Sequence, residues 1–512
     1  MFRVFALIFL AMTAIQGRGA ELTVLTYHDV LPDPGNNIYA VSRSAFVAQM
    51  DYLEQNGYRP VSLKLLEKVQ RGEARLPHKA VVLTFDDGLE SYHKFVVPVL
   101  KIYGFPSLAS IVTGWMDGKN IPPEYLGKLM NWDEVRQVSQ SPLVEIISHT
   151  NNLHYGIQSN PQGNTAAASI TRQYFPIDDT YESEAAFRKR IRDDLDISTQ
   201  RLQQEVGYLP KAIAWPYGYY DRVMVEEANR LGMQFHFSLD DAPATTDQFP
   251  LINRKLVLRD SNITEVLTRH PGASELRFVE INLDTFSGAS SERQEQLLSA
   301  LLDRLQSLHV NTIVVSPFSA DFSKTYFPNH QLPVAQNLLN RVLHQVRTRL
   351  NVRHLCLKLP GNLPVRDIND MYTDLARLNL FTEVVFRSRP KTSNLESISK
   401  TIKYFRPNVK FGIMGNTYNA SDDGFYDFVI APVKNISSHQ TLAQEVAKLQ
   451  QIPLPIYILL NSESDTGTLV NAMKILRSMG VRHFGYKLAS YTADTPNQES
   501  LGKELAASSI NR

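Results

Sequence analysis

The stretch AVVLTFDDG at residues 80–88 decides the fold class. Apolar and β-branched residues fill 80–85, and two aspartates and a glycine follow at once. Unbroken apolar runs of this length are typical of strands buried on both faces, as in a parallel sheet covered by helices. The stretch therefore predicts an α/β fold in which polar groups stand at the carboxyl end of a buried strand.

Further short apolar runs alternate with amphipathic stretches on both sides of this segment, the pattern of an α/β protein. In the first half, the other runs expected to form strands lie at 22–28, 107–112, 144–149, 212–217 and 234–239. Residues 43–57 predict a helix closed by Gly57. The polar residues 155–187 predict a long irregular insertion, and such insertions often carry function.

A second α/β series follows a break near 261–276. Its expected strands lie at 277–284, 312–318, 354–359, 383–388, 410–415, 427–432, 456–461 and 483–488. Eight strands with intervening helices predict a closed (β/α)₈ barrel. A length of 512 residues also suggests at least two domains.

The composition narrows the choice of partners. Hydrophobic residues make up 43% and charged residues 21%, as in ordinary globular proteins. The formal net charge is +1 and no long basic run occurs, so nucleic acid is excluded as a partner. No segment beyond the N-terminus reaches the roughly 18 uninterrupted apolar residues of a membrane span, so no integral membrane segment is expected.

The N-terminus has the pattern of a secretory signal peptide. Arg3 precedes an apolar run, and small residues follow up to Gly19 and Ala20, near which cleavage is expected. The alternative is a buried N-terminal strand or helix. The single cysteine, Cys356, permits no disulfide within the chain, and no cysteine stands at the cleavage site as a lipoprotein requires. We therefore expect a soluble periplasmic or secreted protein that is not a lipoprotein.

Two strand ends carry residues suited to metal-assisted hydrolysis, and parallel strands would bring them to one mouth. Of the adjacent carboxylates Asp86 and Asp87, one would bind a metal while the other takes a proton from water. His149 and His154 would add two imidazoles and leave coordination positions open for water and substrate. Taken singly, Asp-Gly also fits a solvated turn, and histidines five residues apart are common on surfaces.

The third motif is WPYG at 215–218, where proline and glycine shape a turn. Trp215 and Tyr217 would offer faces for sugar stacking, and the backbone N–H near Tyr217 would stabilise an oxyanion. An ordinary turn with core aromatic residues is the alternative for this motif by itself.

Together, TFDDG, the paired histidines and PYG resemble the NodB-type polysaccharide deacetylases, the fourth family of carbohydrate esterases. YHDV at 27–30, SHTNNLHYG at 148–156 and NPQGNT at 160–165 narrow the resemblance to the periplasmic poly-β-1,6-N-acetyl-D-glucosamine N-deacetylases of bacterial biofilm systems. YFPN at 326–329 and LPV at 332–334 extend it into the second half.

The resemblance implies an α/β fold class with an N-terminal (β/α) barrel-like deacetylase domain plus a C-terminal (β/α)₈-type barrel like that of glycoside hydrolases. The expected bounds are a signal peptide at 1–20, the deacetylase domain at 21–262, a linker at 263–275 and the polymer-binding barrel at 276–512. The implied function is partial N-deacetylation of the polysaccharide during its export, with an outer-membrane export protein as a partner.

The resemblance also implies residue roles. Asp87, His149 and His154 would hold one divalent ion, either Zn, Ni, Co or Fe, between which the sequence does not decide. Asp86 would act as the base, and His28 would protonate the departing sugar amine.

Around these residues, Trp215 and Tyr217 would bind substrate and the oxyanion, and Asp241 would orient His28. Two features depart from the wider family. The histidine pair is one residue further apart than usual, and Trp215 stands where an arginine usually precedes PYG. The residue that tethers Asp86 is therefore left open.

The second half is expected to bind the polymer without cutting it. Asp284, Tyr326, Tyr418 and Glu463 are its candidate contacts, as part of an acidic, aromatic groove that would attract glucosamine ammonium groups. FRSRP places Arg387 and Arg389 where hydrolytic relatives are acidic, and arginine cannot act as a general acid. The alternatives are a barrel that only buttresses the first domain, a bifunctional deacetylase and glycoside hydrolase, and a non-catalytic polysaccharide-binding protein.

Overall fold

A computed structural model gives the structure of the chain. It describes residues 20–240, 242, 244–268, 275–350, 352–415, 424–434, 436, 438–460, 465–492 and 497–506. Contacts group the described residues into two compact units. The first unit takes those within Met1–His149, Gln200–Ala214 and Met233–Pro271, and the second takes those within Thr150–Thr199, Trp215–Gly232 and Gly272–Arg512. The domain bounds expected from the sequence stay a prediction.

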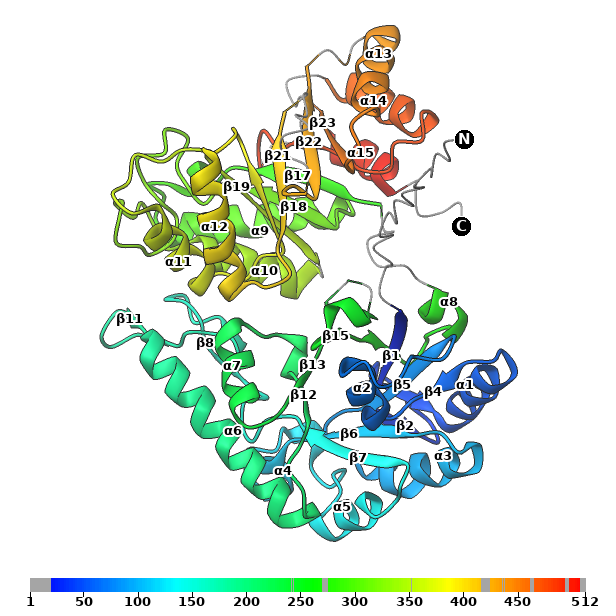
Figure 1. Cartoon of the computed structure of the whole chain (residues 1–512). Helices are drawn as coiled ribbons and strands as arrows, with labels where there is room; N and C mark the ends of the chain where they lie inside the picture. The colour runs from blue at the N-terminus through cyan, green and yellow to red at the C-terminus, as the bar shows by residue number, and fades with distance from the viewer. Residues whose placement is uncertain are drawn as a thin grey trace, which may run out of the picture. The chain divides into compact units, whose positions relative to one another are not determined.

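The first unit is built on one curved, mostly parallel sheet, drawn from blue to green in Figure 1. Its strands lie in the order β14 (Ala244–Thr245), β1 (Glu21–Tyr27), β5 (Ala80–Phe85), β6 (Ser107–Ile111), β7 (Val144–Ser148), β12 (Ala212–Ala214), β13 (Phe235–Ser238) and β15 (Leu251–Asn253). Each of the six apolar runs expected in this half forms a strand, at 21–27, 80–85, 107–111, 144–148, 212–214 and 235–238.

The two ends of this sheet are joined by a short stretch of chain. β15 pairs with β13 at one end. One residue further on, β16 (Lys255–Leu256) pairs with β1 near the other end, so the sheet nearly closes. This near closure confirms the expected barrel-like first domain, and Arg254 is the residue between β15 and β16.

Residues of β5 alternate between two apolar clusters, as the period of a strand requires. Val81, Leu83 and Phe85 pack in one cluster, and Ala80 and Val82 pack in the other. All six residues of the strand are buried. The unbroken apolar run at 80–85 therefore reflects burial on both faces of the sheet.

β4 (Arg59–Pro60) extends the sheet by pairing with β5, and helices connect the strands. The expected helix at 43–57 forms as α1 (Arg43–Gln55), whose first turn is capped by Ser42 accepting the Ala45 N–H at 3.1 Å. The other helices of the first half of the chain are α2 (Leu63–Gln70), α3 (Val97–Tyr103), α4 (Thr113–Met116), α5 (Trp132–Ser139), α6 (Glu184–Val206), α7 (Arg222–Arg230) and α8 (Ile263–Thr268). β2 (Asp29–Leu31) and β3 (Ala40–Ser42) form a separate two-stranded sheet.

The polar segment 155–187 is less irregular than expected. It contains two short antiparallel pairs, β8 (Gly156–Gln158) with β9 (Thr165–Ala167) and β10 (Tyr174–Phe175) with β11 (Thr180–Tyr181). The sequence did not predict these strands, because a strand of two or three residues is too short to show an apolar period.

The second unit contains the expected closed barrel, coloured from green to red in Figure 1. Its parallel strands are β17 (Arg277–Ile281), β18 (Thr312–Val315), β19 (His354–Leu359), β20 (Glu383–Phe386), β21 (Lys410–Met414), β22 (Phe428–Val433), β23 (Ile456–Leu460) and β24 (Phe484–Lys487). β24 pairs with β17 and closes the ring. All eight strands expected from the sequence are present, which confirms the (β/α)₈-type barrel.

Helices accompany the barrel strands: α9 (Ser291–Ser307), α10 (Leu339–Leu350), α11 (Ile368–Leu378), α12 (Thr392–Phe405), α13 (His439–Leu449), α14 (Thr466–Ser478) and α15 (Gln498–Ala506). Cys356 is buried with Phe278, Val314 and Val385, so the free thiol is a packing residue. Within the described part of the chain, no helix has the length and apolar character to cross a bilayer. The expected signal peptide falls almost wholly on residues 1–19, which lie outside the described residues.

Candidate active site

The two adjacent aspartates follow β5 in a tight left-handed turn. Asp87 has φ 75° and Gly88 has φ 74°. A Cβ on Gly88 would meet Met116 Cε at 3.1 Å and Ile111 Cδ1 at 3.2 Å, so glycine fits the space as well as the backbone angle. Asp86 is 4% exposed and Asp87 is fully buried. Two buried carboxylates in a strained turn are costly, which is typical of a functional site.

The second strand end brings an imidazole to Asp87. His149 follows β7 and is 1% exposed. Its Nδ1–H donates to the Ala214 carbonyl oxygen at 2.7 Å, which leaves Nε2 with a lone pair. Nε2 lies 3.5 Å from Asp87 Oδ1. Histidines that bind metals are usually oriented by a hydrogen bond of this kind from the other ring nitrogen.

His154 completes a group of three residues able to hold a cation. Asp87, His149 and His154 each offer one ligand atom, and these atoms all lie within 4.8 Å of one another. Burial lowers the pKa of His149, but the carboxylates of Asp86 and Asp87 outweigh it and raise that pKa, so the local field favours positive charge. One carboxylate and two imidazoles at this spacing fit a divalent ion with open coordination positions.

The turn that carries His154 is held by Asp194, a residue that the sequence analysis missed. Thr150 in this turn has φ 70°. The two carboxylate oxygens of Asp194, on α6, accept the backbone N–H groups of Asn151 at 2.9 Å and Asn152 at 2.6 Å. Asp194 is 7% exposed. It fixes the backbone between the two candidate histidine ligands.

Asp86 is tethered by two residues. Arg254 Nη1 lies 2.7 Å from Asp86 Oδ1, and the Ser110 hydroxyl donates to the same oxygen. Burial raises the pKa of Asp86, but the charges of Arg254, His149 and His28 outweigh it and lower that pKa to about 2. Asp86 is therefore ionised at neutral pH. The arginine that the sequence lacked before PYG is supplied from the stretch between β15 and β16.

His28 follows β1 and is partly buried beside Tyr39, with ring centroids 5.3 Å apart. Its charge contributes to the lowered pKa of Asp86. The buried Nδ1 of His28 makes no hydrogen bond with a described residue. Asp241, the residue expected to orient it, lies outside the described residues. The assignment of Asp241 thus stays a prediction.

The PYG motif forms a single 3₁₀ turn in which Tyr217 has φ 57°. The Tyr217 side chain is 45% exposed, and its ring centroid lies 4.5 Å from that of His154. Trp215, in contrast, is fully buried and has no ring face open to a sugar. The prediction that Trp215 stacks on a sugar was therefore wrong. Tyr217 is the aromatic residue of this motif that solvent can reach.

Comparison with known proteins agrees with this geometry. Residues 73–236 match the family model described as polysaccharide deacetylase. The chain carries a polysaccharide deacetylase domain. Residues 280–360 match a second model, described as hypothetical glycosyl hydrolase family 13. The resemblance drawn from TFDDG, the paired histidines and PYG is confirmed.

Relatives of the deacetylase domain come from several bacteria. The poly-β-1,6-N-acetyl-D-glucosamine N-deacetylase of Escherichia coli K12 is 31% identical over 348 residues, covering 64% of this chain and 51% of the relative. The enzyme of the same name from Staphylococcus aureus N315 is 24% identical over 237 residues, covering 46% and 74%. The chain spans about half the length of the E. coli relative.

A solved structure is also similar. The de-N-acetylase from Aggregatibacter actinomycetemcomitans is 31% identical, with a TM-score of 0.44, and the match covers 48% of this chain and 98% of that one.

Outside the deacetylase domain, one of the four barrel residues expected to bind polymer is buried. Tyr326 is 1% exposed, and its hydroxyl donates to Asp284 Oδ1. Asp284 also accepts the Ala320 N–H at 3.1 Å. These two residues are partners of each other, so the expectation that Tyr326 offers a sugar-stacking face was wrong. Tyr418 and Glu463 lie outside the described residues.

We expect Asp194→Asn to weaken metal binding by about ten-fold, because an amide can accept only one of the two backbone N–H groups and the turn between the histidines loosens. Competition with a coloured chelator measures the affinity. Asp193→Asn is the matched control, since Asp193 is half exposed and forms a surface ion pair with Lys189. Equal metal affinity in both variants would show that Asp194 does not support the histidine ligands.

We expect Arg254→Met to lower the free energy of unfolding of the first unit by about 3–5 kcal/mol, because the substitution leaves the Asp86 charge buried without its partner. Adding Asp86→Asn to that variant should restore part of the loss. Urea unfolding followed by circular dichroism measures both. Arg259→Met, which removes an arginine paired with the exposed Asp260, should change stability by less than about 0.5 kcal/mol. A double variant less stable than Arg254→Met would contradict the pairing.

Proposed function

We propose that this chain is a metal-dependent hydrolase that removes acetyl groups from poly-β-1,6-N-acetyl-D-glucosamine. One observation carries the proposal: an ionised, tethered Asp86 lies next to a group of Asp87, His149 and His154 that fits a divalent ion. Deacetylation of an amide needs both parts, a base for water and an electrophile for the carbonyl. The names of the E. coli and S. aureus relatives support the choice of polysaccharide.

Asp87, His149 and His154 would hold the ion, and its identity among Zn, Ni, Co and Fe is not set by these ligands. When bound, a divalent ion supplies Lewis acidity that polarises the acetamide carbonyl and lowers the pKa of water. His149 is suited to this role because its Nδ1–H is already committed to the Ala214 carbonyl oxygen, which fixes the orientation of the ring.

The proton transfers fall to two residues. Asp86 is ionised and receives the proton of the attacking water, while Arg254 and Ser110 hold its carboxylate in place. His28, when protonated, gives a proton to the amine nitrogen as it leaves the acetyl carbon. The charges of Arg254, His149 and His28 lower the pKa of Asp86 and so keep this carboxylate ready to take the proton.

Tyr217 completes the proposed site from the PYG turn. Tyr217 adopts a left-handed backbone conformation within this turn. Its backbone N–H would stabilise the oxyanion of the tetrahedral intermediate. The exposed ring beside His154 would lie against a sugar residue of the polymer. The glycan would thus be held by an aromatic face next to the ion and the base.

The proposal also includes a cellular setting. The mature chain would act in the periplasm or outside the cell, during export of the polysaccharide and with an outer-membrane export protein as a partner. The apolar N-terminal run after Arg3 supports this setting.

The full-length chain and β-1,6-linked N-acetylglucosamine oligosaccharides test the proposed activity. Acetate should be released while the mass spectrum of the sugar loses whole acetyl groups and no sugar units. No acetate release from a metal-loaded chain would refute the activity. Shortened oligosaccharides would favour the bifunctional alternative, with which the glycosyl hydrolase match of residues 280–360 is consistent. Among the described residues lining the barrel pocket, however, Glu280 is the single carboxylate, whereas glycoside hydrolysis ordinarily needs two.

A further inference from the structure

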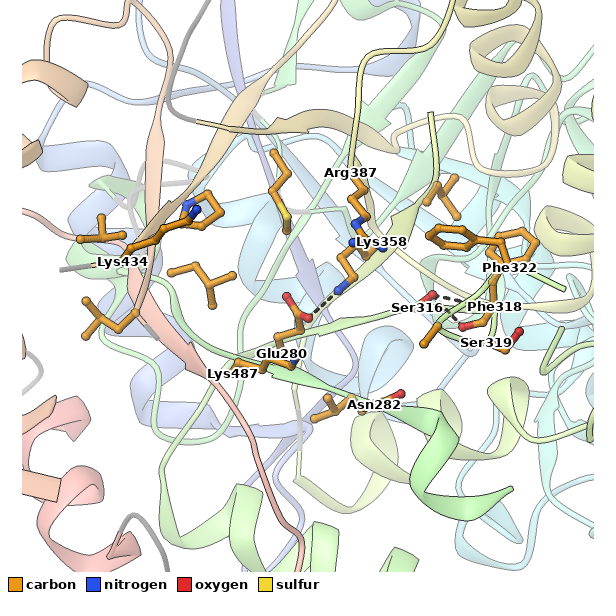
Figure 2. Close-up of a pocket in the computed structure, with 18 residues that line it drawn as sticks. Glu280, Asn282, Ser316, Phe318, Ser319, Phe322, Lys358, Arg387, Lys434 and Lys487 are labelled. Carbon is orange, nitrogen blue, oxygen red and sulfur yellow. Dashed lines mark hydrogen bonds and ion pairs between the residues drawn. The ribbon is translucent and has the colours of Figure 1, made fainter. Parts of the chain in front are cut away.

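A pocket of about 560 Å³ opens at the carboxyl ends of the barrel strands, the end where such barrels bind ligands. Its described charged residues are Lys358, Arg387, Lys434, Lys487 and Glu280, drawn in Figure 2. Four cations face one carboxylate, a formal excess of three positive charges. The described part of the pocket lining is thus cationic, whereas Glu463, an acid of the groove expected from the sequence, lies outside the described residues.

The single carboxylate does not neutralise this excess. Glu280 is 6% exposed, and Figure 2 shows Lys358 reaching toward it in an ion pair. Arg387, Lys434 and Lys487 form no ion pair with any described residue and are exposed. Exposed cations that gather around one cavity, with no acidic partner among the described residues, repel one another, and a bound anion would relieve that repulsion.

One wall of the pocket is aromatic. Phe318 and Phe322 line it, with ring centroids 6.4 Å apart. The Arg387 guanidinium carbon lies 5.5 Å from the centre of the Phe322 ring. Phe322 is half-buried and has φ 59°, so a left-handed backbone conformation holds this ring in the pocket wall. An aromatic face beside a guanidinium suits a sugar ring that carries a negative charge.

We propose that the barrel mouth binds an anionic sugar, one bearing a carboxylate or a phosphate group. The anion lies among Arg387, Lys434 and Lys487, and the sugar ring packs against Phe322. Asn282 and Ser319 also line the pocket, and their side chains can bond to hydroxyl groups. A glucosamine ammonium group is disfavoured here, because it would add to the positive charge. This site is separate from the proposed deacetylase activity.

Isothermal titration calorimetry of the full-length chain tests the site with glucuronic acid, glucose 6-phosphate, glucose and glucosamine as probes. At least one of the two anionic sugars should bind ten-fold or more tightly than glucose, glucosamine should bind most weakly, and added salt should reduce the difference. Binding of glucuronic acid alone identifies a carboxylate ligand, and binding of glucose 6-phosphate alone identifies a phosphate ligand. Equal affinity for glucose and both anions, preference for glucosamine, or no binding of any probe would overturn the proposal.

Variants locate the binding. Arg387→Gln and Lys487→Gln should each weaken binding of the anionic sugar ten-fold or more, and both side chains are exposed, so the chain should stay folded. Lys448→Gln is the matched control, because Lys448 lies in the last turn of α13 and does not line the pocket. Loss of affinity in the Lys448 variant to the same extent would show general charge attraction and overturn the site. Thermal unfolding of each variant verifies that the fold is kept.

Discussion

Asp86→Asn should release acetate about 10³-fold more slowly than the unaltered chain while binding the same amount of divalent ion. Asparagine has nearly the same shape as aspartate, and its amide oxygen can still accept from Arg254 and Ser110. It cannot take a proton from water, so the loss falls on the chemical step. Acetate release under saturating substrate gives kcat, and plasma mass spectrometry gives the ion content per chain.

Asp260→Asn is the control for this change, since Asp260 is an exposed aspartate that pairs with Arg259. It should leave both quantities unchanged. If Asp86→Asn stripped the ion, Asp86 would be a ligand and the division of roles between the two adjacent aspartates would be wrong. Turnover close to that of the unaltered chain would instead exclude Asp86 as the base.

Single alanine variants of Asp87, His149 and His154 should lose both the bound ion and turnover, by about 10³-fold or more, because each removes one ligand of a three-ligand site. His154 is the most informative position. It is partly exposed, whereas His149 is buried and bonded to the Ala214 carbonyl oxygen, so His149→Ala also disturbs packing. Ion content, acetate release and circular dichroism together separate loss of the ion from loss of the fold.

His93→Ala is the matched control for imidazole loss. His93 is partly exposed and contacts Gln137 and Glu134, neither of which is a candidate ligand. It should keep full ion content and turnover. Retention of the ion by His154→Ala would mean that His154 is not a ligand, and the proposed site would then lack its third donor.

Much of the fold follows from the sequence, because parallel strands covered on both faces are unbroken apolar runs. The run at 80–85 and the eight runs of the barrel all became strands for this reason. The short antiparallel pairs within 156–181 did not stand out, because strands of two or three polar residues have no period.

The candidate site was predictable where its residues directly follow long strands. Asp86, Asp87 and His149 stand at such ends, and parallel topology brings these ends together. Arg254 was missed because it lies between two very short strands and reaches Asp86 only through the near closure of the sheet. Asp194 was missed because, in the sequence, it is one acid among several charged residues of a long helix.

Burial at the barrel mouth and the charge of the described pocket lining were not predictable from residue types alone. Tyr326 follows a strand in the chain, but packing and its bond to Asp284 turn it inward. Trp215 is buried in the same way. The cationic pocket arises because Lys358, Arg387, Lys434 and Lys487 come from four different strand ends, which only the closed ring brings together.

The most direct test of the account is acetate release from poly-β-1,6-N-acetyl-D-glucosamine before chelation, after chelation, and after a divalent ion is returned. We predict that the chelated chain stops releasing acetate, stays folded, and regains activity when Zn, Co, Ni or Fe is added back. Undiminished acetate release by a chain shown to contain no metal would contradict the central claim.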